Sequence, residues 1–342
     1  MDFKIGDHVR GTAGSQGYYT QPGELLEAVV TDLNPDGDVR IRVIRHTRYE
    51  AKTLPEFEVV AGEIELIGRG RRIMVKHVVL YSGGHSSALA AIETVRQYGP
   101  ENVILLNHDI NPRTEDADIK RFKREVAEYL GLLITYANMA DVSQKDHFDV
   151  CVEQKAFKYG MQSSAICTRK LKTEPFARWL SGQDSSSLEL VYGFDETEQK
   201  RIARRTRIMG EQGYRCVYPL TSQIELRNIE DIGIRRPDTY KTYRHANCIG
   251  CLKAGRQHWY CVYCLRPDIW DKAKWAEQKI GYTILKGTPL SLLEPMFAEL
   301  KLCQLQATEL IKPQTFWASA RRLLAQNTKT AAPDTAIVRS GT

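Results

Sequence analysis

The feature that most constrains the fold is a strand-like segment that leads through a glycine pair into a helix-like segment. Residues 77–81 are mostly apolar and predict a buried strand, and the alanine-rich residues 86–98 predict a helix. Between them, Ser82-Gly83-Gly84 lets backbone N–H groups approach an anion closely, because glycine carries no side chain. The first turn of the helix adds unpaired N–H donors and the positive end of its dipole. This order predicts an anion-binding loop, and the alternative is an ordinary glycine turn with a serine cap.

The same alternation of strand-like and helix-like segments continues through the middle of the chain. Further strands are expected at residues 102–107, 132–137 and 188–192. Helices are expected at residues 86–98, 116–130, 148–159, 173–180 and 196–209. This alternation predicts an α/β domain with a doubly wound parallel sheet over residues 77–236. Because ligands bind at the carboxyl ends of such strands, Asp109 is expected at the same edge of the sheet as Ser82.

Residues 1–67 show a different pattern, in which short β segments alternate with polar turns. Residues 39–43 alternate apolar side chains with arginines, which predicts a strand with one buried face and one solvent-exposed face. The turn at residues 34–38 is a hairpin signal, since its glycine supplies a positive φ angle. Together the segments predict a small β-barrel that resembles the SH3-like barrels of the Tudor and KOW kind. A linker rich in glycine and arginine is expected at residues 68–76.

The cysteines are concentrated toward the C-terminal part of the chain. Of the 8 cysteines, four form Cys-x-x-Cys pairs, at residues 248–251 and 261–264. The chain starts without an apolar leader, so we expect it in the cytoplasm, where this spacing indicates metal or redox chemistry rather than disulfides. Four thiolates suit either a zinc ion or a [4Fe–4S] cluster, and the spacing does not separate the two. We expect a cysteine-rich helical region over residues 237–326 and a disordered tail over residues 327–342.

Two basic segments and the net charge favour an anionic partner. The formal net charge is +6, and no apolar run is long enough to suggest a membrane segment. Arg169, Lys170 and Lys172 follow Cys167 closely. Cations of this kind can bind phosphate, lower the pKa of a thiol or offset an anionic cluster. Five of the eight residues from 200 to 207 are also basic, which fits phosphate neutralisation, a nucleic-acid strand or a solvated helix face.

Three segments together resemble one known superfamily. The loop at residues 82–87 reads Ser-Gly-Gly-His-Ser-Ser and is similar to the Ser-Gly-Gly-x-Asp-Ser pyrophosphate loop of the PP-loop ATP pyrophosphatases. Residues 167–175 and 248–251 resemble the PAPS reductase-like branch of that superfamily, close to the ATP-dependent sulfurtransferases. The resemblance covers about residues 76 to 270. It departs at Ser86, where the family carries an aspartate.

The resemblance implies a HUP-type PP-loop domain that binds ATP with Mg²⁺. The residues implied to hold the pyrophosphate are Ser82, Gly83, Gly84, His85, Ser86 and Ser87. The implied further phosphate contacts are Arg169 and Lys170, and the implied catalytic candidates are Asp109, Lys172 and Arg201. The resemblance also implies a [4Fe–4S] cluster, with Zn²⁺ as the alternative, on Cys167, Cys248, Cys251 and Cys264. Cys261 is the alternative to Cys264 as the fourth ligand.

The reaction that the resemblance implies is adenylation of an acceptor followed by sulfur transfer. An acceptor oxygen attacks the α-phosphorus of ATP, pyrophosphate leaves, and a sulfur nucleophile displaces AMP. RNA or DNA is a candidate acceptor, and a sulfur-donor protein is a candidate partner. One alternative is a thiol-dependent reductase of adenylyl sulfate, which the lack of a Glu-Cys-Gly-like end disfavours. The other alternative is a nucleic-acid-binding module with a degenerate nucleotide pocket, which the N-terminal segment and Ser86 favour.

Overall fold

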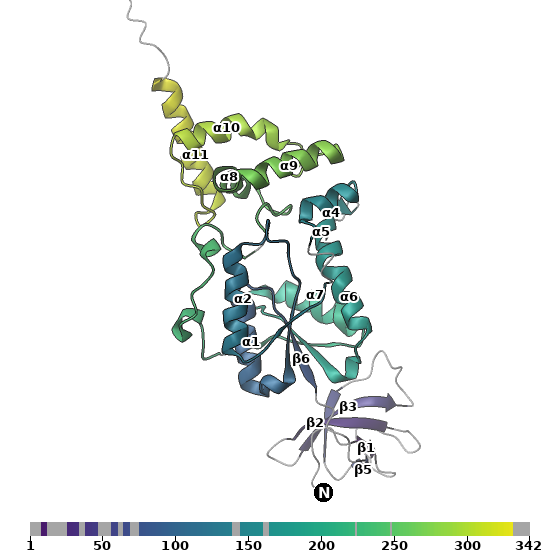
Figure 1. Cartoon of the computed structure of the whole chain (residues 1–342). Coiled ribbons are helices and arrows are strands. Elements are labelled where there is room, and N and C mark those ends of the chain that lie inside the picture. Colours follow the sequence, from purple (N-terminus) through teal and green to yellow (C-terminus); the bar gives the residue numbers. More distant parts are fainter. Residues whose placement is uncertain are drawn as a thin grey trace, which may run out of the picture. The chain divides into compact units, whose positions relative to one another are not determined.

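The computed structural model describes residues 8–11, 26–33, 38–46, 56–60, 64–68, 75–138, 144–159, 164–222, 224–246 and 248–330 (Figure 1). The chain divides into two compact units. The first unit comprises residues 1–78, 94–103 and 183–222, and the second comprises residues 79–93, 104–182 and 223–342. The domain limits expected from the sequence stay predictions.

An antiparallel sheet forms the N-terminal part of the first unit. Its strands are β1 (His8–Gly11), β2 (Leu26–Leu33), β3 (Asp38–His46), β4 (Glu56–Val60) and β5 (Ile64–Gly68). They are ordered β4-β3-β2-β1-β5, and each neighbouring pair runs antiparallel. Val39 and Ile41 are buried, in agreement with the alternation expected for this segment. The predicted hairpin turn and most of the predicted linker lie outside the described residues, and the SH3-like identity of the sheet stays a prediction.

The middle of the chain folds as an α/β structure around a mostly parallel sheet. Its strands are β6 (Lys76–Leu80), β7 (Val103–Asn107), β8 (Ile134–Tyr136), β11 (Leu188–Val191) and β12 (Arg215–Val217). They are ordered β12-β11-β6-β7-β8, with β11 parallel to β12 and β7 parallel to β8. The helices of this part are α1 (His85–Tyr98), α2 (Ala117–Tyr129), α6 (Glu174–Ser181) and α7 (Gln199–Gly210). The predicted α/β class is therefore confirmed.

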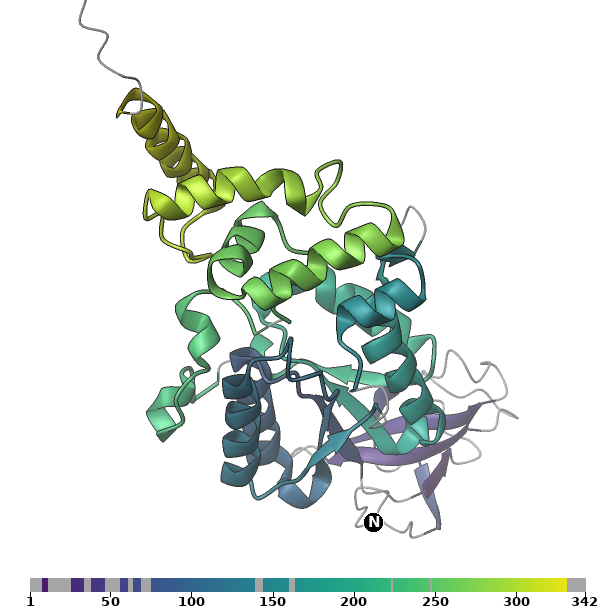
Figure 2. The same ribbon diagram turned by 45° about the horizontal axis from the view of Figure 1, so that its top comes forward.

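The C-terminal part of the second unit is helical. Its helices are α8 (Arg256–Leu265), α9 (Pro267–Ile280), α10 (Leu290–Leu302) and α11 (Pro313–Thr330), which lie together in both ribbon views (Figures 1 and 2). Trp259, Trp270 and Phe297 are buried among them and form the apolar core of this part. Gly281 ends α9 with a φ angle of 86°, the left-handed conformation that glycine adopts without strain. Among the described residues, no helix has both the length and the apolar character that crossing a membrane requires.

The helix predicted over residues 148–159 is wrong in its second half. The observed helix α4 (His147–Glu153) starts with Asp146 as its N-cap in a capping box. It stops because Lys155 adopts a φ angle of 51°, which a helix cannot continue through. The chain then forms the short strand β9 (Lys158–Tyr159), which pairs with β10 (Ser164–Ala165). Apolar periodicity alone did not reveal this left-handed residue.

A buried carboxylate organises the first unit. Glu189 in β11 is 6% exposed and contacts three cationic or basic side chains. Its carboxylate oxygens lie 3.2 Å from His77 Nδ1, 3.1 Å from Arg215 Nη1 and 3.5 Å from Arg42 Nη2. Burial raises the pKa of Glu189, but the contact with His77 and the charges of the two arginines outweigh burial, so the pKa is lowered overall. Arg42 also donates to Ser186 O at 3.0 Å, so the network ties β3 to the segment before β11.

We expect Glu189→Gln to destabilise the protein at neutral pH but not at low pH. The folded-state pKa lies below the unfolded value, so this stabilisation is present above about pH 4.3 and is lost as the pH falls through the folded-state pKa. The free energy of unfolding at pH 7 should fall by about 1.5–3 kcal/mol, which is the usual contribution of a hydrogen bond to a charged group. Urea unfolding at pH 7 and near pH 3 measures it. Glu211→Gln is the matched control, because its pair with Arg207 is exposed. Equal losses in both variants would contradict the prediction.

Candidate functional site

The loop between β6 and α1 is a short glycine turn that leads into a helix start, and its predicted anion binding stays a prediction. Gly83 adopts a φ angle of 81°, and α1 begins two residues later at His85. Ser82 and Ser86 are exposed, whereas Ser87 is buried and donates to Gly84 O at 2.8 Å. Ser82 in turn donates to the Ser87 hydroxyl at 3.2 Å. The first turn of α1 and two exposed hydroxyls therefore surround one short glycine turn.

A buried lysine from α2 packs against this loop. Lys123 is 2% exposed, and a Cβ atom placed on Gly83 would lie 2.5 Å from its Cε atom. Its ammonium group donates to Glu115 Oε1 at 2.6 Å and to Asn107 Oδ1 at 3.2 Å. Burial lowers the pKa of Lys123, and the carboxylate of Glu115 opposes that shift. The Gly83 position therefore has room for a glycine alone, with a lysine directly behind it.

Asp109 joins the same network at the carboxyl end of β7. Its carboxylate lies 2.7 Å from Lys120 Nζ, which is also 3.8 Å from Glu115 Oε2. The backbone of Asp109 is held on both sides by the amide of Asn138, at 2.6 and 2.7 Å. Within the described residues, the buried Oε2 atom of Glu115 has no hydrogen-bond donor. Asp109 and Glu115 thus offer carboxylate oxygens, the ligand type that Mg²⁺ prefers.

A later segment of the chain covers the start of α1. The backbone N–H of His85 donates to the Tyr240 hydroxyl at 3.1 Å. The His85 ring accepts from the N–H of Ile229 at 3.3 Å, which fits a neutral imidazole. Burial, and then the charge of Arg236, lower the pKa of His85. His85 therefore fixes the covering segment, and the Tyr240 hydroxyl bonds to one of the N–H groups at the helix start.

Three of the predicted cysteine ligands interact electrostatically. Burial, with smaller contributions from the nearby thiols of Cys251 and Cys167, raises the pKa of Cys248 to about 11, although the charge of Lys172 opposes the shift. Burial also raises the pKa of Cys251, with Cys167 again contributing. A hydrogen bond with Cys151 and the charges of Lys172 and Lys253 lower the pKa of Cys167 to about 7, although burial opposes this. Cys167, Cys248 and Cys251, which we call the thiol triad, therefore share one neighbourhood.

Lys172 links the thiol triad to the carboxyl end of β7. Its charge lowers the pKa of Cys248, Cys251 and Cys167. It also acts on His108, whose pKa burial and then Lys172 lower to about 4. Lys172 lies in a π-helical turn (Arg169–Thr173) between α5 (Ile166–Thr168) and α6, a distortion that often occurs at functional positions. The charge of the exposed Lys172 thus acts both on the thiols and on the strand end that carries Asp109.

The remaining predicted site residues have other partners. Cys264 lies at the end of α8, where burial raises its pKa and a hydrogen bond with Tyr260 and the charge of Lys301 oppose that shift. Arg169 and Lys170 both bind the carboxylate of Glu174, at 2.9 and 3.1 Å. Arg201 belongs to the first unit and pairs with Glu198 in the same exposed segment. The predicted roles of these four residues stay predictions.

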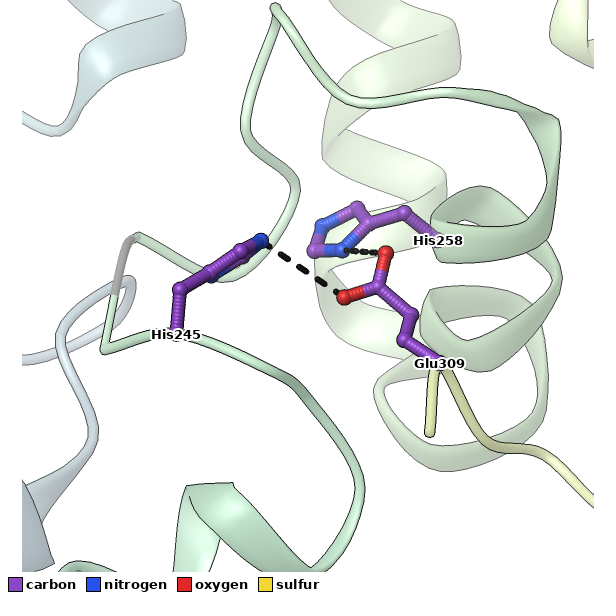
Figure 3. A group of neighbouring side chains, drawn as sticks. All are labelled: His245, His258 and Glu309. Atoms are coloured by element: carbon purple, nitrogen blue, oxygen red, sulfur yellow. Dashed lines mark hydrogen bonds and ion pairs between the residues drawn. The ribbon is translucent and has the colours of Figure 1, made fainter. Parts of the chain in front are cut away.

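His245, His258 and Glu309 form a compact group in which all candidate ligand atoms lie within 4.8 Å of one another (Figure 3). Their hydrogen bonds favour a structural role over a metal site. His258 Nε2 accepts from the N–H groups of Gly250 and Cys251, at 3.1 and 3.3 Å. The ring proton must then be on Nδ1, which faces Glu309 Oε1 at 3.1 Å and has no lone pair left for a metal.

The hydrogen bonds that His258 accepts hold the turn at residues 248–251. Gly250 has a φ angle of 74°, and a Cβ atom there would lie 2.7 Å from Ile269, so only glycine fits. His147 Nε2 contacts Gly250 O at 2.9 Å, and the N–H of Cys251 on the same peptide unit donates to His258 Nε2 at 3.3 Å. The two histidines therefore anchor the turn that presents Cys248 and Cys251.

No model of a known protein family matches the chain, and no curated protein matches it. The functional argument therefore depends on the geometry of the site. Sequence reasoning missed Lys123, Glu115 and Tyr240. A lysine within the apolar face of α2, beside the buried Ile119 and Phe122, was the one available signal for Lys123.

Proposed function

We propose that the chain is an ATP-binding enzyme of the PP-loop type, with a HUP-like doubly wound domain, that adenylates an acceptor and transfers sulfur to it. The observation that carries the proposal is the left-handed Gly83 between β6 and α1, packed directly against the buried Lys123. A glycine loop that packs against the side chain of a buried lysine, at a helix start, suits a polyphosphate. The antiparallel N-terminal sheet is, in this proposal, an SH3-like element that binds a partner.

The residues around the loop fit ATP and magnesium. Ser82, Gly83, Gly84, His85, Ser86 and Ser87 would hold the pyrophosphate with hydroxyl and backbone N–H groups. Asp109 and Glu115 would hold Mg²⁺, and the Glu115 oxygen that lacks a hydrogen-bond donor among the described residues fits such a ligand. The Tyr240 hydroxyl would leave the His85 N–H when phosphate binds there.

In the proposed reaction, the residues of the chain mainly position the reactants and neutralise charge. An acceptor oxygen attacks the α-phosphorus, the bond to the bridging oxygen breaks, and pyrophosphate carries away the electron pair. A sulfur nucleophile then attacks the acceptor carbon, and AMP leaves with the former acceptor oxygen. Lys123 behind the loop and Lys120 beside Asp109 supply positive charge where the leaving group gains negative charge.

The thiol triad fits a metal group. Its members are partly buried, and each thiolate raises the pKa of a neighbouring thiol, so a cationic group between them would relieve that repulsion. Cys167, Cys248 and Cys251, with Cys264 as the predicted fourth ligand, would hold a [4Fe–4S] cluster, and zinc is the alternative. A bound cluster would supply a place to hold sulfur for transfer.

A second candidate function is thiol-dependent reduction of adenylyl sulfate. One observation favours it: Cys167 shares a hydrogen bond with Cys151, and this contact lowers the pKa of Cys167 to about 7. The Cys167 thiolate would attack the sulfur and release AMP. The Cys151 thiol would then attack Cys167 Sγ, which forms a disulfide and releases sulfite. An external thiol reductant would restore the two thiols.

The product formed from each substrate separates these functions. With ATP, Mg²⁺, a sulfide donor and single-stranded RNA or DNA, the proposed enzyme releases pyrophosphate and AMP only when an acceptor is present. A reductase instead releases sulfite from adenylyl sulfate in the presence of a dithiol. If neither product forms while the protein binds nucleic acid tightly and in a salt-dependent way, the chain is a binding module.

A further inference from the structure

The first unit carries three aromatic rings that form a platform. The ring centroids of Tyr192, Phe194 and Tyr218 are 5.4, 5.9 and 6.1 Å apart, and their planes differ by 29°, 27° and 16°. Three near-parallel rings at equal spacing cannot stack as one column, because the outer two would then be about twice as far apart. They therefore form a compact cluster in which each ring is offset from the other two and nearly parallel to them. The N–H of Tyr192 donates to Val217 O at 3.0 Å, which places the platform where β11 and β12 end.

Helix α7 brings cations to these rings. The guanidinium of Arg201 lies 4.2 Å from the centre of the Phe194 ring, and that of Arg205 lies 5.8 Å from the centre of Tyr192. The helix carries five cations and no acidic residue. Arg201 and Arg207 pair with carboxylates outside the helix. Within the described part of the chain, the exposed Arg204 and Arg205 have no acidic partner.

A further polar group at the platform lacks a partner. The hydroxyl of Tyr192 is buried and has no hydrogen bond among the described residues, although the residue is only 7% exposed. Burial raises the pKa of Tyr192 and raises that of Tyr218 to about 12, so both hydroxyls keep their protons and remain donors. A buried donor beside rings and cations needs an acceptor from elsewhere.

We propose that Tyr192, Phe194 and Tyr218, together with the α7 cations, bind single-stranded nucleic acid. Bases stack on the rings, and phosphates pair with the guanidinium groups of Arg204 and Arg205. A single strand fits because its base faces are open, whereas a duplex hides them. An acidic peptide would satisfy the cations but leave the rings without a partner. The inference rests on the proposed function only in that nucleic acid is the acceptor named there.

Binding of a labelled single strand in the absence of ATP tests the surface. The probes are RNA and DNA oligonucleotides of about twelve nucleotides, and fluorescence anisotropy of the full chain reports affinity. We expect the double variant Arg204→Gln/Arg205→Gln to bind roughly tenfold or more weakly, with a smaller salt dependence. Arg207→Gln is the matched control, because it removes a charge from the same helix that Glu211 already neutralises. Equal effects of the double variant and the control would overturn the proposal.

The role of the rings needs a separate comparison. Phe194→Leu keeps an apolar side chain but removes the stacking face, and we expect roughly a fivefold to hundredfold loss of affinity. The same variant should bind an abasic strand of equal length as the unchanged chain does, since that probe carries phosphates without bases. Wild-type protein that binds the abasic strand as tightly as the oligonucleotide would show that the rings do not hold bases and would overturn the proposal. Equally tight binding of polyglutamate would favour an acidic protein partner and would also overturn it.

Failure of this inference is distinguishable from failure of the proposed function. A variant of the glycine loop, Gly84→Ala, should lose ATP but keep oligonucleotide binding, because its change lies in the other unit. Oligonucleotide binding without pyrophosphate release would support the surface and refute the enzyme. Pyrophosphate release with unchanged binding by Phe194→Leu and Arg204→Gln/Arg205→Gln would support the enzyme and refute the surface.

Discussion

ATP binding is expected to disappear in Gly84→Ala while the protein stays folded. A Cβ atom on Gly84 would have its nearest neighbours at 3.4, 3.6 and 3.9 Å, and the residue has no positive φ angle, so the free chain can accommodate the methyl group. The same methyl group would occupy the space through which a phosphate approaches the backbone N–H groups. The loss of two charge-assisted hydrogen bonds, each worth roughly 1.5–3 kcal/mol, should lower the affinity for ATP at least about a hundredfold. Isothermal titration calorimetry with ATP and Mg²⁺ measures this.

Two further glycines separate backbone strain from the effect of the site. Gly83→Ala places its Cβ atom 2.5 Å from Lys123 and should destabilise the fold as well as abolish ATP binding. Gly131→Ala carries a comparable left-handed strain, with a φ angle of 66°, but its Cβ atom meets nothing within 4 Å. It should therefore keep ATP affinity. The double variant Ser82→Ala/Gly83→Val should lose ATP as well. A folded Gly84→Ala protein with unchanged ATP affinity would contradict the PP-loop proposal.

The strand–glycine–helix order of the loop could be predicted from the sequence because that order is local. The strand, the glycine pair and the helix start follow one another within residues 76–98. The alternation of strands and helices was equally readable, because each buried strand leaves an apolar run. The end of α4 was not readable, since one left-handed residue, Lys155, decides it.

The support around the loop could not be predicted, because it comes from residues far away in the chain. Tyr240 contacts the His85 N–H although the two residues are 155 positions apart in the sequence, and neither residue type predicts that contact. Lys123 lies on an apolar helix face, where a buried charged residue is rare and does not by itself indicate a function. The thiol triad required the superfamily resemblance, since spacing alone would have paired Cys248 and Cys251 with Cys261 and Cys264.

Iron content after anaerobic reconstitution should fall to background in Cys167→Ser, as it should in Cys248→Ser and Cys251→Ser. The reason is that the three thiols share one electrostatic neighbourhood, so each would be a ligand of the proposed cluster. Iron and sulfide analysis, together with the visible spectrum, provides the measurement. A cluster gives a brown protein that air bleaches, whereas zinc gives a colourless protein that air does not affect. Cys216→Ser is the matched control, because this thiol belongs to the other unit.

The fourth ligand and the charge balance sharpen the same test. If Cys264→Ser also loses iron, the predicted fourth ligand is correct; if it keeps iron, the fourth position belongs to another group. Arg169 and Lys170 are bound to Glu174, so Lys172 and Lys253 are the cations that act on the triad. Lys172→Gln should therefore weaken iron retention, while Lys170→Gln should not. Full zinc occupancy, no iron, and metal content unaffected by Cys167→Ser would together refute the cluster, because a zinc knuckle at residues 248–264 has no use for Cys167.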